Sequence, residues 1–567
     1  MSKRRMLFPA LAVSIASLFP ATDALSTDAR DQNNVRLVLQ ITVDGLRRDL
    51  LDRYRQRFGQ GGFRYLLESG TFFANAHYQH ANTETIVGHT TLATGTYPSD
   101  HGMIGNVWYD SERGELRYNI EDPKHPLLPT RQNALEGVQV DPAQKLARTK
   151  GRSPASILVE TFSDRLKAYY GGRSKVFAVS AKDRGAVSMA GHTGKAFWFS
   201  TDNGDFVSST YYYDEYPDWV VDWNKQRQVE LLGGQQWQLL NDLPTYLLGH
   251  QDDRPYETDL RGYGRVFPHQ FAAAGSPILP TQAIVSPYGD RLTLDFAKLL
   301  VRSEGLGSDS IPDYLSISFS GLDAVNHFFG PSSLENEDMM LQLDRTLRDL
   351  LAFIDETVGL DKTLIVLSAD HGMAEMPEYM TELGFPAGRL YPEDIIAAAN
   401  QIAKERFDIE DIVRFYYRPY LYLDAGKLDS ASFEADQVQN EIAAALTVRP
   451  GIALALARGE LMKPQATQLR LQVQRSFHPE RSGDIYVVQD LYWFNFDKGP
   501  VAAMHGSPWR YDTHVPIIFA GAGIRSRVVH RLVHPVDVAP TLSAVLGMTA
   551  PGSAKGTILG EALGDDD

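Results

Sequence analysis

Four apolar segments that end in charged residues constrain the fold of this chain more than any other feature. Each contains a run of Val, Ile, Leu or Phe, and the segments are residues 36–45, 175–184, 314–323 and 363–372. Three of them end at or near an aspartate (Asp44, Asp323 and Asp370), and the fourth ends in the cations Lys182 and Arg184. Runs this continuous are typical of strands that are buried on both faces of a parallel sheet.

Helical patterns lie between these segments. The clearest covers residues 334–358, where leucines recur on one face and Ser332 or Ser333 can cap the start. Shorter helices are predicted over residues 154–170 and 537–546. Alternation of strands and helices predicts an α/β fold with a mostly parallel central sheet sandwiched by helices. In such sheets ligands bind beyond the carboxyl ends of the strands, which is where the three aspartates are expected.

Two long stretches interrupt this order. The length of 567 residues would by itself allow three or four domains. We instead interpret residues 195–285 and 376–500 as cap insertions in one catalytic domain that covers residues 33–550. The second insertion includes a helix-like run at 436–447, and residues 551–567 form a C-terminal tail.

The first 24 residues have the layout of a secretory signal peptide. Lys3, Arg4 and Arg5 precede a mostly apolar run over residues 6–19, and small and polar residues follow. This run is too short to cross a bilayer comfortably, and no later stretch reaches about 18 apolar residues. We therefore expect export to the periplasm or the medium, with no membrane span in the mature chain. An uncleaved anchor is the alternative.

Composition excludes several classes of function. The chain has 55 basic and 71 acidic residues, a net charge of −16, and would repel a nucleic-acid backbone over most of its surface. A role as a nucleic-acid scaffold is therefore excluded, whereas a small basic pocket for a phosphorylated substrate is not. The absence of cysteine excludes disulfides, thiolate metal sites and a cysteine nucleophile. Any metal must be held by His, Asp and Glu.

Three carboxylates and three imidazoles form a candidate set of metal ligands. Its members are Asp44, Asp323, His327, Asp370, His371 and His505. Asp323 and His327 are four residues apart and share a face if their segment is helical. Oxygen and nitrogen donors suit Zn²⁺, and two ions about 4 Å apart could stabilise the attacking and leaving oxygens of an in-line displacement. Each residue alone has a plainer explanation, such as a helix cap or a packed histidine. The joint pattern favours a metal site.

A threonine-rich segment, residues 82–95, offers a candidate nucleophile. A hydroxyl at a helix start lies where backbone N–H groups and the helix dipole stabilise an oxyanion, and contact with a metal would lower its pKa further. Five threonines compete for this role, namely Thr83, Thr85, Thr90, Thr91 and Thr94. The ordinary role of a threonine at this place is an N-cap, and the residues alone do not choose among the five.

Short motifs along the chain together suggest a family. They are Val43-Asp44-Gly45, Thr85-x-x-Gly88-His89, Thr94-Gly95, Pro98, His101-Gly102, Gly105-Asn106-x-Trp108, Lys182-Asp-Arg184-Gly-Ala, Asp323-x-x-x-His327, Asp370-His371-Gly372 and His505-Gly506. With them the sequence resembles the alkaline phosphatase superfamily. It is most similar to the phosphate-irrepressible alkaline phosphatases, a branch with a threonine nucleophile that is related to nucleotide pyrophosphatases/phosphodiesterases. Each motif alone is weak, but the ordered set covers residues 36–545 and is highly specific.

The resemblance implies an alkaline phosphatase-like fold and a role for individual residues. Thr85 would be the nucleophile and would bridge toward one of two Zn²⁺ ions. The ligands would be Asp44, Asp370 and His371 for this ion, and Asp323, His327 and His505 for the other. The phosphoryl oxygens would be contacted by Asn106, Lys182 and Arg184. The implied reaction is the hydrolysis of a phosphate monoester to an alcohol and inorganic phosphate through a phosphothreonine intermediate.

Lys182 and Arg184 favour a monoesterase over a diesterase. A monoester presents two anionic charges at its non-bridging oxygens, whereas a diester presents one and carries a second organic group. Charge-assisted hydrogen bonds contribute roughly 1.5–3 kcal/mol each, so two cations could favour the dianion by about 3–6 kcal/mol before solvent screening. The plainer explanation is that both are solvated residues at a strand end. The nearest rival function is a nucleotide pyrophosphatase/phosphodiesterase, which would share Thr85 and both zinc sites.

Other rivals have less support. The Cys/Ser-x-Pro-x-Arg nucleophile motif of sulfatases is absent from the sequence. Phosphonoacetate-type hydrolases share the metal-binding residues, and the sequence excludes them only weakly. A catalytically silent binding protein of the same fold would have no reason to retain all of these residues. We therefore expect small-molecule phosphate monoesters as substrates. The sequence carries no signature of the physiological ester or of the oligomeric state.

Overall fold

The computed structural model describes most of the chain. The described residues are 34–130, 138–139, 141–147, 150–496 and 501–563. The predicted signal segment, residues 1–24, and the last four residues of the predicted tail lie outside them. None of the helices formed by the described residues is long and apolar enough to cross a membrane.

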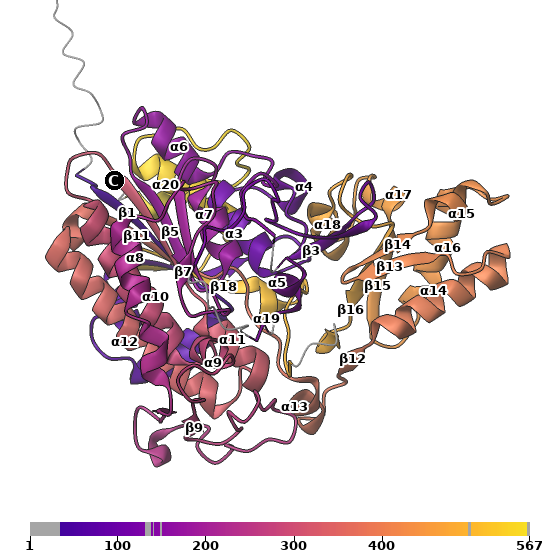
Figure 1. Ribbon diagram of the computed structural model, residues 1–567. Coiled ribbons are helices and arrows are strands. Elements are labelled where there is room, and N and C mark those ends of the chain that lie inside the picture. The colour runs from indigo at the N-terminus through magenta and orange to yellow at the C-terminus, as the bar shows by residue number, and fades with distance from the viewer. Residues whose placement is uncertain (1–33, 131–137, 140, 148–149, 497–500, 564–567) are drawn as a thin grey trace, which may run out of the picture.

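A nine-stranded sheet forms the centre of the molecule (Figure 1). Its strands, in spatial order, are β19 (Arg527–Val529), β2 (Thr71–His77), β18 (His514–Gly521), β11 (Thr363–Ser368), β1 (Leu37–Val43), β10 (Asp313–Phe319), β5 (Val176–Ser180), β6 (Lys195–Phe199) and β7 (Phe206–Val207). The five strands from β11 to β6 run parallel, whereas β18 and β7 pair antiparallel with their neighbours. The predicted α/β fold with a mostly parallel central sheet is confirmed.

Strand β1 lies between β10 and β11 and aligns their carboxyl ends. Val43 pairs with Phe319 on one side, and Thr42 pairs with Ser368 on the other. On the far side of β10, β5 ends in register with β10. The four apolar segments recognised in the sequence therefore end at one edge of the sheet, and the charged residues that follow them are brought together there.

Helices cover both faces of the sheet because alternate residues of a buried strand point to opposite sides. Leu39 packs into one layer with α10 (Pro287–Glu304) and α12 (Leu334–Thr357). Val38 packs into the opposite layer with α6 (Phe162–Tyr169) and α20 (Val538–Val545). Two further helices on this second side are α3 (Thr85–Thr94) and α7 (Asp183–Ala190).

The predicted helices largely match the observed ones. The helix expected over 334–358 is α12, and the hydroxyl of Ser333 caps it by accepting from the N–H of Asn336 at 3.0 Å. The helix expected over 154–170 is shorter, because the capping box of Thr161 and Asp164 sets the start of α6. The residues before this cap form turns instead.

A second sheet is formed by residues within the 376–500 stretch, and it extends to the right of the main body in Figure 1. Its antiparallel strands, in spatial order, are β13 (Val413–Tyr417), β14 (Tyr420–Leu423), β16 (Ile485–Gln489) and β15 (Ile452–Ala457). Helices α14 (Pro392–Phe407) and α16 (Ala435–Thr447) pack against it around Ile402 and Ile442. The other stretch, 195–285, differs from a pure cap, because it begins with two strands of the central sheet.

Gly88 sets the closest approach between α3 and the turn after β11. A Cβ atom at Gly88 would lie 1.8 Å from the backbone oxygen of Asp370. We expect Gly88→Ala to force these elements apart and to destabilise the protein by about 1–3 kcal/mol, seen as a lower midpoint of thermal unfolding. The matched change Gly552→Ala, where a Cβ would meet nothing within 4 Å, should leave the midpoint unchanged. Equal midpoints for the two variants would contradict this expectation.

Candidate active site

Three strand ends and one short helix bring five of the six predicted ligands to the same edge of the sheet, and the sixth, His505, comes from the loop before α19 (Arg510–Thr513). Asp44 directly follows β1, and its N–H donates to the last backbone carbonyl of β10 at 2.9 Å. Asp370 and His371 follow β11 after one alanine. Strand β10 leads into α11 (Gly321–Phe329), whose first turn carries Asp323.

All six predicted metal ligands converge. Their potential ligand atoms form two groups, each with members within 4.8 Å of one another: Asp44, Asp370 and His371, and Asp323, His371 and His505. His371 belongs to both groups, whereas the sequence places it in the first alone. The sixth residue, His327, lies one turn after Asp323 on α11, and its Nε2 is 3.4 Å from Oδ2 of Asp323.

Backbone hydrogen bonds orient the three histidine rings. The Nδ1 atoms of His327, His371 and His505 lie 2.8–2.9 Å from backbone carbonyl oxygens. A carbonyl oxygen only accepts, so each Nδ1 carries the proton and each Nε2 presents its lone pair. Nε2 of His371 faces Oδ1 of Asp44 and Oδ2 of Asp370, both at 3.4 Å. This is the tautomer and orientation in which imidazole binds a metal.

A single ammonium group lies between two of the buried carboxylates. Nζ of Lys182 is 2.7 Å from Oδ2 of Asp44 and also contacts Oδ2 of Asp323. Burial and the neighbouring carboxylates raise the pKa of Asp44 to about 6. Burial acts in the same direction at Asp370, but the imidazoles beside it, His371 first, outweigh burial and lower the pKa of Asp370 to about 2. Three buried carboxylates of the cluster, Asp44, Asp323 and Asp370, thus share the one ammonium group of Lys182.

The donor set fits divalent cations. Oδ1 of Asp44 and Oδ1 of Asp323 are buried and accept no hydrogen bond from any described residue. A buried carboxylate oxygen without a donor is costly. The two oxygens lie 3.4 Å from Nε2 of His371 and 3.6 Å from Nε2 of His505, respectively. A cation between the oxygen and the nitrogen of each pair would bind both the carboxylate oxygen and the imidazole lone pair. Such mixed oxygen and nitrogen sites are typical of Zn²⁺.

Thr85 is the first residue of α3, and its side chain is fully buried beside the ligand cluster. Its Oγ1 lies 3.5 Å from Nε2 of His371 and accepts a hydrogen bond from Nη2 of Arg184 at 3.4 Å. The preceding residue, Glu84, is the N-cap, so Thr85 does not have the ordinary capping role. The hydroxyl thus lies between the candidate ligands and a cation, at the positive end of a helix.

The other four threonines of the segment have different surroundings. The hydroxyls of Thr83 and Thr94 donate to backbone carbonyls at 2.9 and 2.7 Å. The hydroxyl of Thr91 lies between two buried histidines, and that of Thr90 is buried without a partner among the described residues. Geometry therefore singles out Thr85, which the sequence could do only by resemblance.

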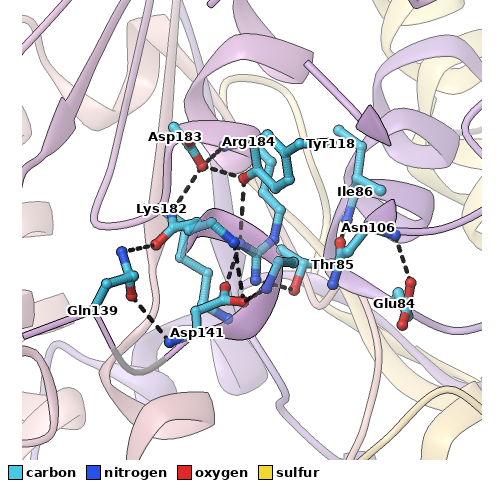
Figure 2. Close-up of polar contacts among 12 residues, drawn as sticks. Glu84, Thr85, Ile86, Asn106, Tyr118, Gln139, Asp141, Lys182, Asp183 and Arg184 are labelled. Atoms are coloured by element: carbon cyan, nitrogen blue, oxygen red, sulfur yellow. Dashed lines mark hydrogen bonds and ion pairs between the residues drawn. The ribbon is translucent and has the colours of Figure 1, made fainter. Parts of the chain in front are cut away.

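An ion pair and a hydrogen bond hold the guanidinium of Arg184 beside Thr85 (Figure 2). Nη1 of Arg184 lies 2.7 Å from Oδ2 of Asp141 and 3.5 Å from the hydroxyl of Tyr118. That hydroxyl donates to Oδ1 of Asp183 at 2.6 Å. With Nη1 committed to Asp141 and Tyr118, Nη2 is the group directed at the Thr85 hydroxyl.

A pocket opens over this cluster, and its lining has two characters. Its polar side chains include Asn106, Lys182, Arg184, His327 and His505. Its less polar side chains include Val285, Phe328, Tyr417 and Met504. The polar side chains suit a phosphoryl group, and the others suit a less polar organic group.

The chain matches a known protein family over most of its length. The family model described as type I phosphodiesterase / nucleotide pyrophosphatase matches residues 38–508, from the second residue of β1 to just beyond His505. The chain belongs to this family. Within it, the alkaline phosphatase PafA of Elizabethkingia meningoseptica is 32% identical over 93% of this chain and 94% of its own length. The alkaline phosphatase PhoV of Synechococcus elongatus is 30% identical over 98% and 99%, respectively.

A solved structure agrees with the family assignment. The crystal structure of wild-type alkaline phosphatase PafA has a TM-score of 0.84 to this chain at 31% identity, and the match covers 94% of this chain and 99% of that one. The family resemblance and the alkaline phosphatase-like fold expected from the motifs are confirmed.

Sequence reasoning missed three residues that shape the site. Asp141 and Tyr118 hold Arg184, and Glu84 accepts the backbone N–H of Asn106 at 2.5 Å. Asp141 and Tyr118 do not follow a strand of the central sheet, so no periodic pattern marks them. Glu84 directly precedes Thr85, and this adjacency is the one signal that could have identified it.

Proposed function

We propose that this protein is an alkaline phosphatase that hydrolyses phosphate monoesters to an alcohol and inorganic phosphate through a phosphothreonine intermediate at Thr85. The observation that carries the proposal is the position of the Thr85 hydroxyl, 3.5 Å from Nε2 of His371 and 3.4 Å from Nη2 of Arg184. His371 belongs to the ligand cluster. Arg184 lines the pocket together with Lys182, and these two side chains form the cationic wall of the pocket. Both relatives named above are alkaline phosphatases, which supports the same activity.

In the proposed reaction, the cationic wall binds the phosphoryl group and Thr85 attacks it. Lys182, Arg184 and the side-chain amide of Asn106 bind the non-bridging oxygens, where negative charge is spread in the transition state. Oγ1 of Thr85 then loses its proton and forms a bond to phosphorus while the bond from phosphorus to the alcohol oxygen breaks, and the departing oxygen takes up a proton to give the alcohol. Water hydrolyses the phosphothreonine, which releases inorganic phosphate and restores the hydroxyl.

The ligand cluster is proposed to hold two Zn²⁺ ions. Asp44, Asp370 and His371 are the proposed ligands of the ion beside Thr85, and Asp323, His327 and His505 are those of the other. Bound there, the ions would neutralise charge on the transferred group and lower the pKa of the attacking hydroxyl. Two observations support this assignment. Oδ1 of Asp44 and Oδ1 of Asp323 accept no hydrogen bond from any described residue. The histidines present Nε2 toward these carboxylates.

The alternative within the family is a phosphodiesterase, as the description of the family model allows. A paired assay of one aryl monoester and its methyl diester, with metal analysis of the same sample, distinguishes the two. We expect the monoester to have the higher kcat/KM, because Lys182 and Arg184, which both line the pocket, are proposed to bind its two anionic oxygens. A higher kcat/KM for the diester would reverse the proposal.

The proposed setting is outside the cytoplasm. The basic and apolar composition of residues 1–24 supports export, to the periplasm or the medium, with removal of this segment. N-terminal sequencing of the protein recovered from the periplasm and from the medium tests this. Small-molecule phosphate esters are the proposed partners, because the pocket lining combines cations with less polar side chains.

Removal of the Thr85 hydroxyl tests the nucleophile. We expect Thr85→Ala to lower kcat for a monoester by about 10³-fold or more while the metal content per chain stays at the parent level. Thr90→Ala is the matched control, because it removes a buried hydroxyl five residues later on the same helix, and it should keep most of the activity. Parent-like turnover by Thr85→Ala would exclude Thr85 as the nucleophile.

Removal of the Arg184 guanidinium tests the choice between esters. Loss of a charge-assisted contact should lower kcat/KM for the monoester by about 10- to 100-fold. The diester carries one negative charge fewer at its non-bridging oxygens, so Arg184→Ala should affect its hydrolysis much less. Equal losses on the two substrates would remove the argument that the cations select monoesters.

Metal removal tests the ligand cluster. A strong chelator should abolish activity and lower the midpoint of thermal unfolding, because Lys182 alone offsets only part of the charge of the three buried carboxylates. Zn²⁺ should restore both, and elemental analysis should find less zinc in Asp44→Asn and Asp323→Asn than in the parent. Full restoration by Mg²⁺ alone would contradict the zinc assignment.

A further inference from the structure

The residue before the proposed nucleophile, Glu84, has no part in the reaction described above, yet its side chain is buried in the wall of the pocket. Its Oε2 accepts the backbone N–H of Asn106 at 2.5 Å (Figure 2). Its Oε1 lies 3.5 Å from Nη2 of Arg418. The carboxylate of Glu84 therefore contacts both Asn106, which is proposed to bind phosphate, and Arg418, a cation from another part of the chain.

Hydrogen bonds engage the backbone N–H, the backbone carbonyl and the side-chain Oδ1 of Asn106. Its N–H donates to Glu84, and its side-chain Oδ1 accepts from the N–H of Ile86 at 3.3 Å. Its backbone carbonyl accepts from the N–H and the Nδ2 of Asn119, at 3.2 and 2.8 Å. Among the described residues no hydrogen bond engages its Nδ2 amino group, so this donor is the group of Asn106 left for a ligand in the pocket that the residue lines. The direction of this donor thus depends on contacts made by the backbone of Asn106, including the one to Glu84.

Arg418 reaches the site from the second sheet. It lies in the turn between β13 and β14, and its side chain is 12% exposed. Nη1 of Arg418 donates to the backbone carbonyl of His505 at 3.1 Å, while Nη2 faces Glu84. The same guanidinium therefore contacts the acceptor that holds Asn106 and the backbone of a candidate metal ligand.

Two glycines of the sequence motifs make room for this ion pair. A Cβ at Gly105 would lie 3.0 Å from Oε2 of Glu84. A Cβ at Gly506, which has a φ of +113°, would lie 3.2 Å from Nη1 of Arg418. The glycines next to Asn106 and His505 are thus explained by the close approach of Glu84 and Arg418.

We propose that Glu84 and Arg418 are positioning residues, through which the second sheet fixes the direction of the Asn106 amide toward the phosphoryl group. The inference rests on the proposed phosphatase function. Arg418 holds the carboxylate of Glu84, and that carboxylate holds the backbone of Asn106. The 376–500 stretch therefore contributes to the chemistry itself and is more than a cover over the pocket.

Single substitutions in the full-length, metal-loaded protein test the chain of contacts. Glu84→Ala should lower kcat/KM for an aryl monoester by about 10- to 100-fold, as expected for loss of a hydrogen bond to a charged group. Arg418→Met and Glu84→Gln keep an acceptor for the N–H of Asn106. Each should therefore lower kcat/KM by about tenfold. Inhibition by inorganic phosphate should weaken in the same order. Arg414→Met is the matched control, because Arg414 lies on β13 with its side chain 58% exposed, and it should stay within about twofold of the parent.

A double-mutant cycle separates positioning from a merely structural role. In an Asn106→Ala background, Glu84→Ala should lower kcat/KM by less than about threefold, because its effect is exerted through the side-chain amide that this background lacks. An equal loss in both backgrounds would overturn the proposal, as would parent-like activity of Arg418→Met. If Glu84→Ala does not fold, Glu84→Gln replaces it in the cycle. An inactive parent would instead overturn the proposed function, and this inference with it.

Discussion

The register between β1, β10 and β11 is the constraint on which the site depends. It ends three buried strands at one edge of the sheet and so brings three carboxylates together away from water. Carboxylates that are buried close together repel one another strongly, because the dielectric constant around them is low. Neighbouring cationic groups offset part of this repulsion. Lys182 lies between two of the carboxylates, and His89 contacts Asp370 at 3.1 Å. The remaining deficit of positive charge is what makes the cluster suited to cations.

The sequence predicted the sheet, and it predicted that the candidate ligands lie close together, because both follow from local patterns. A continuous apolar run marks a buried parallel strand, and the charged residue at its end marks the edge where ligands gather. Asp44 and Asp370 were recognisable on this basis, and the structure brings them within reach of His371. The sharing of His371 between two groups was not predictable, because it depends on the angle at which one ring lies between two strand ends.

The residues that orient the site were harder to find. Asp141 and Arg418 lie outside the strands of the central sheet, and each acts on a residue far away in the sequence. Their contacts depend on how the loops and the second sheet pack, which no periodic pattern records. The predicted helix start at 154 was wrong for a related reason, since a capping box further along the chain sets the first turn of α6. Apolar periodicity thus gives the scaffold, while tertiary packing decides the orientation of the polar groups.

The bridging position of Lys182 has a consequence for how the protein assembles. A cluster of three carboxylates would ordinarily oppose its own formation until an ion arrived from solution. Here the chain carries an internal counter-ion on the loop that follows β5, and its ammonium group reaches both Asp44 and Asp323. Two of the three carboxylates are therefore paired with a cation of the chain itself, and the proposed metal ions would enter a cluster whose negative charge is already offset in part.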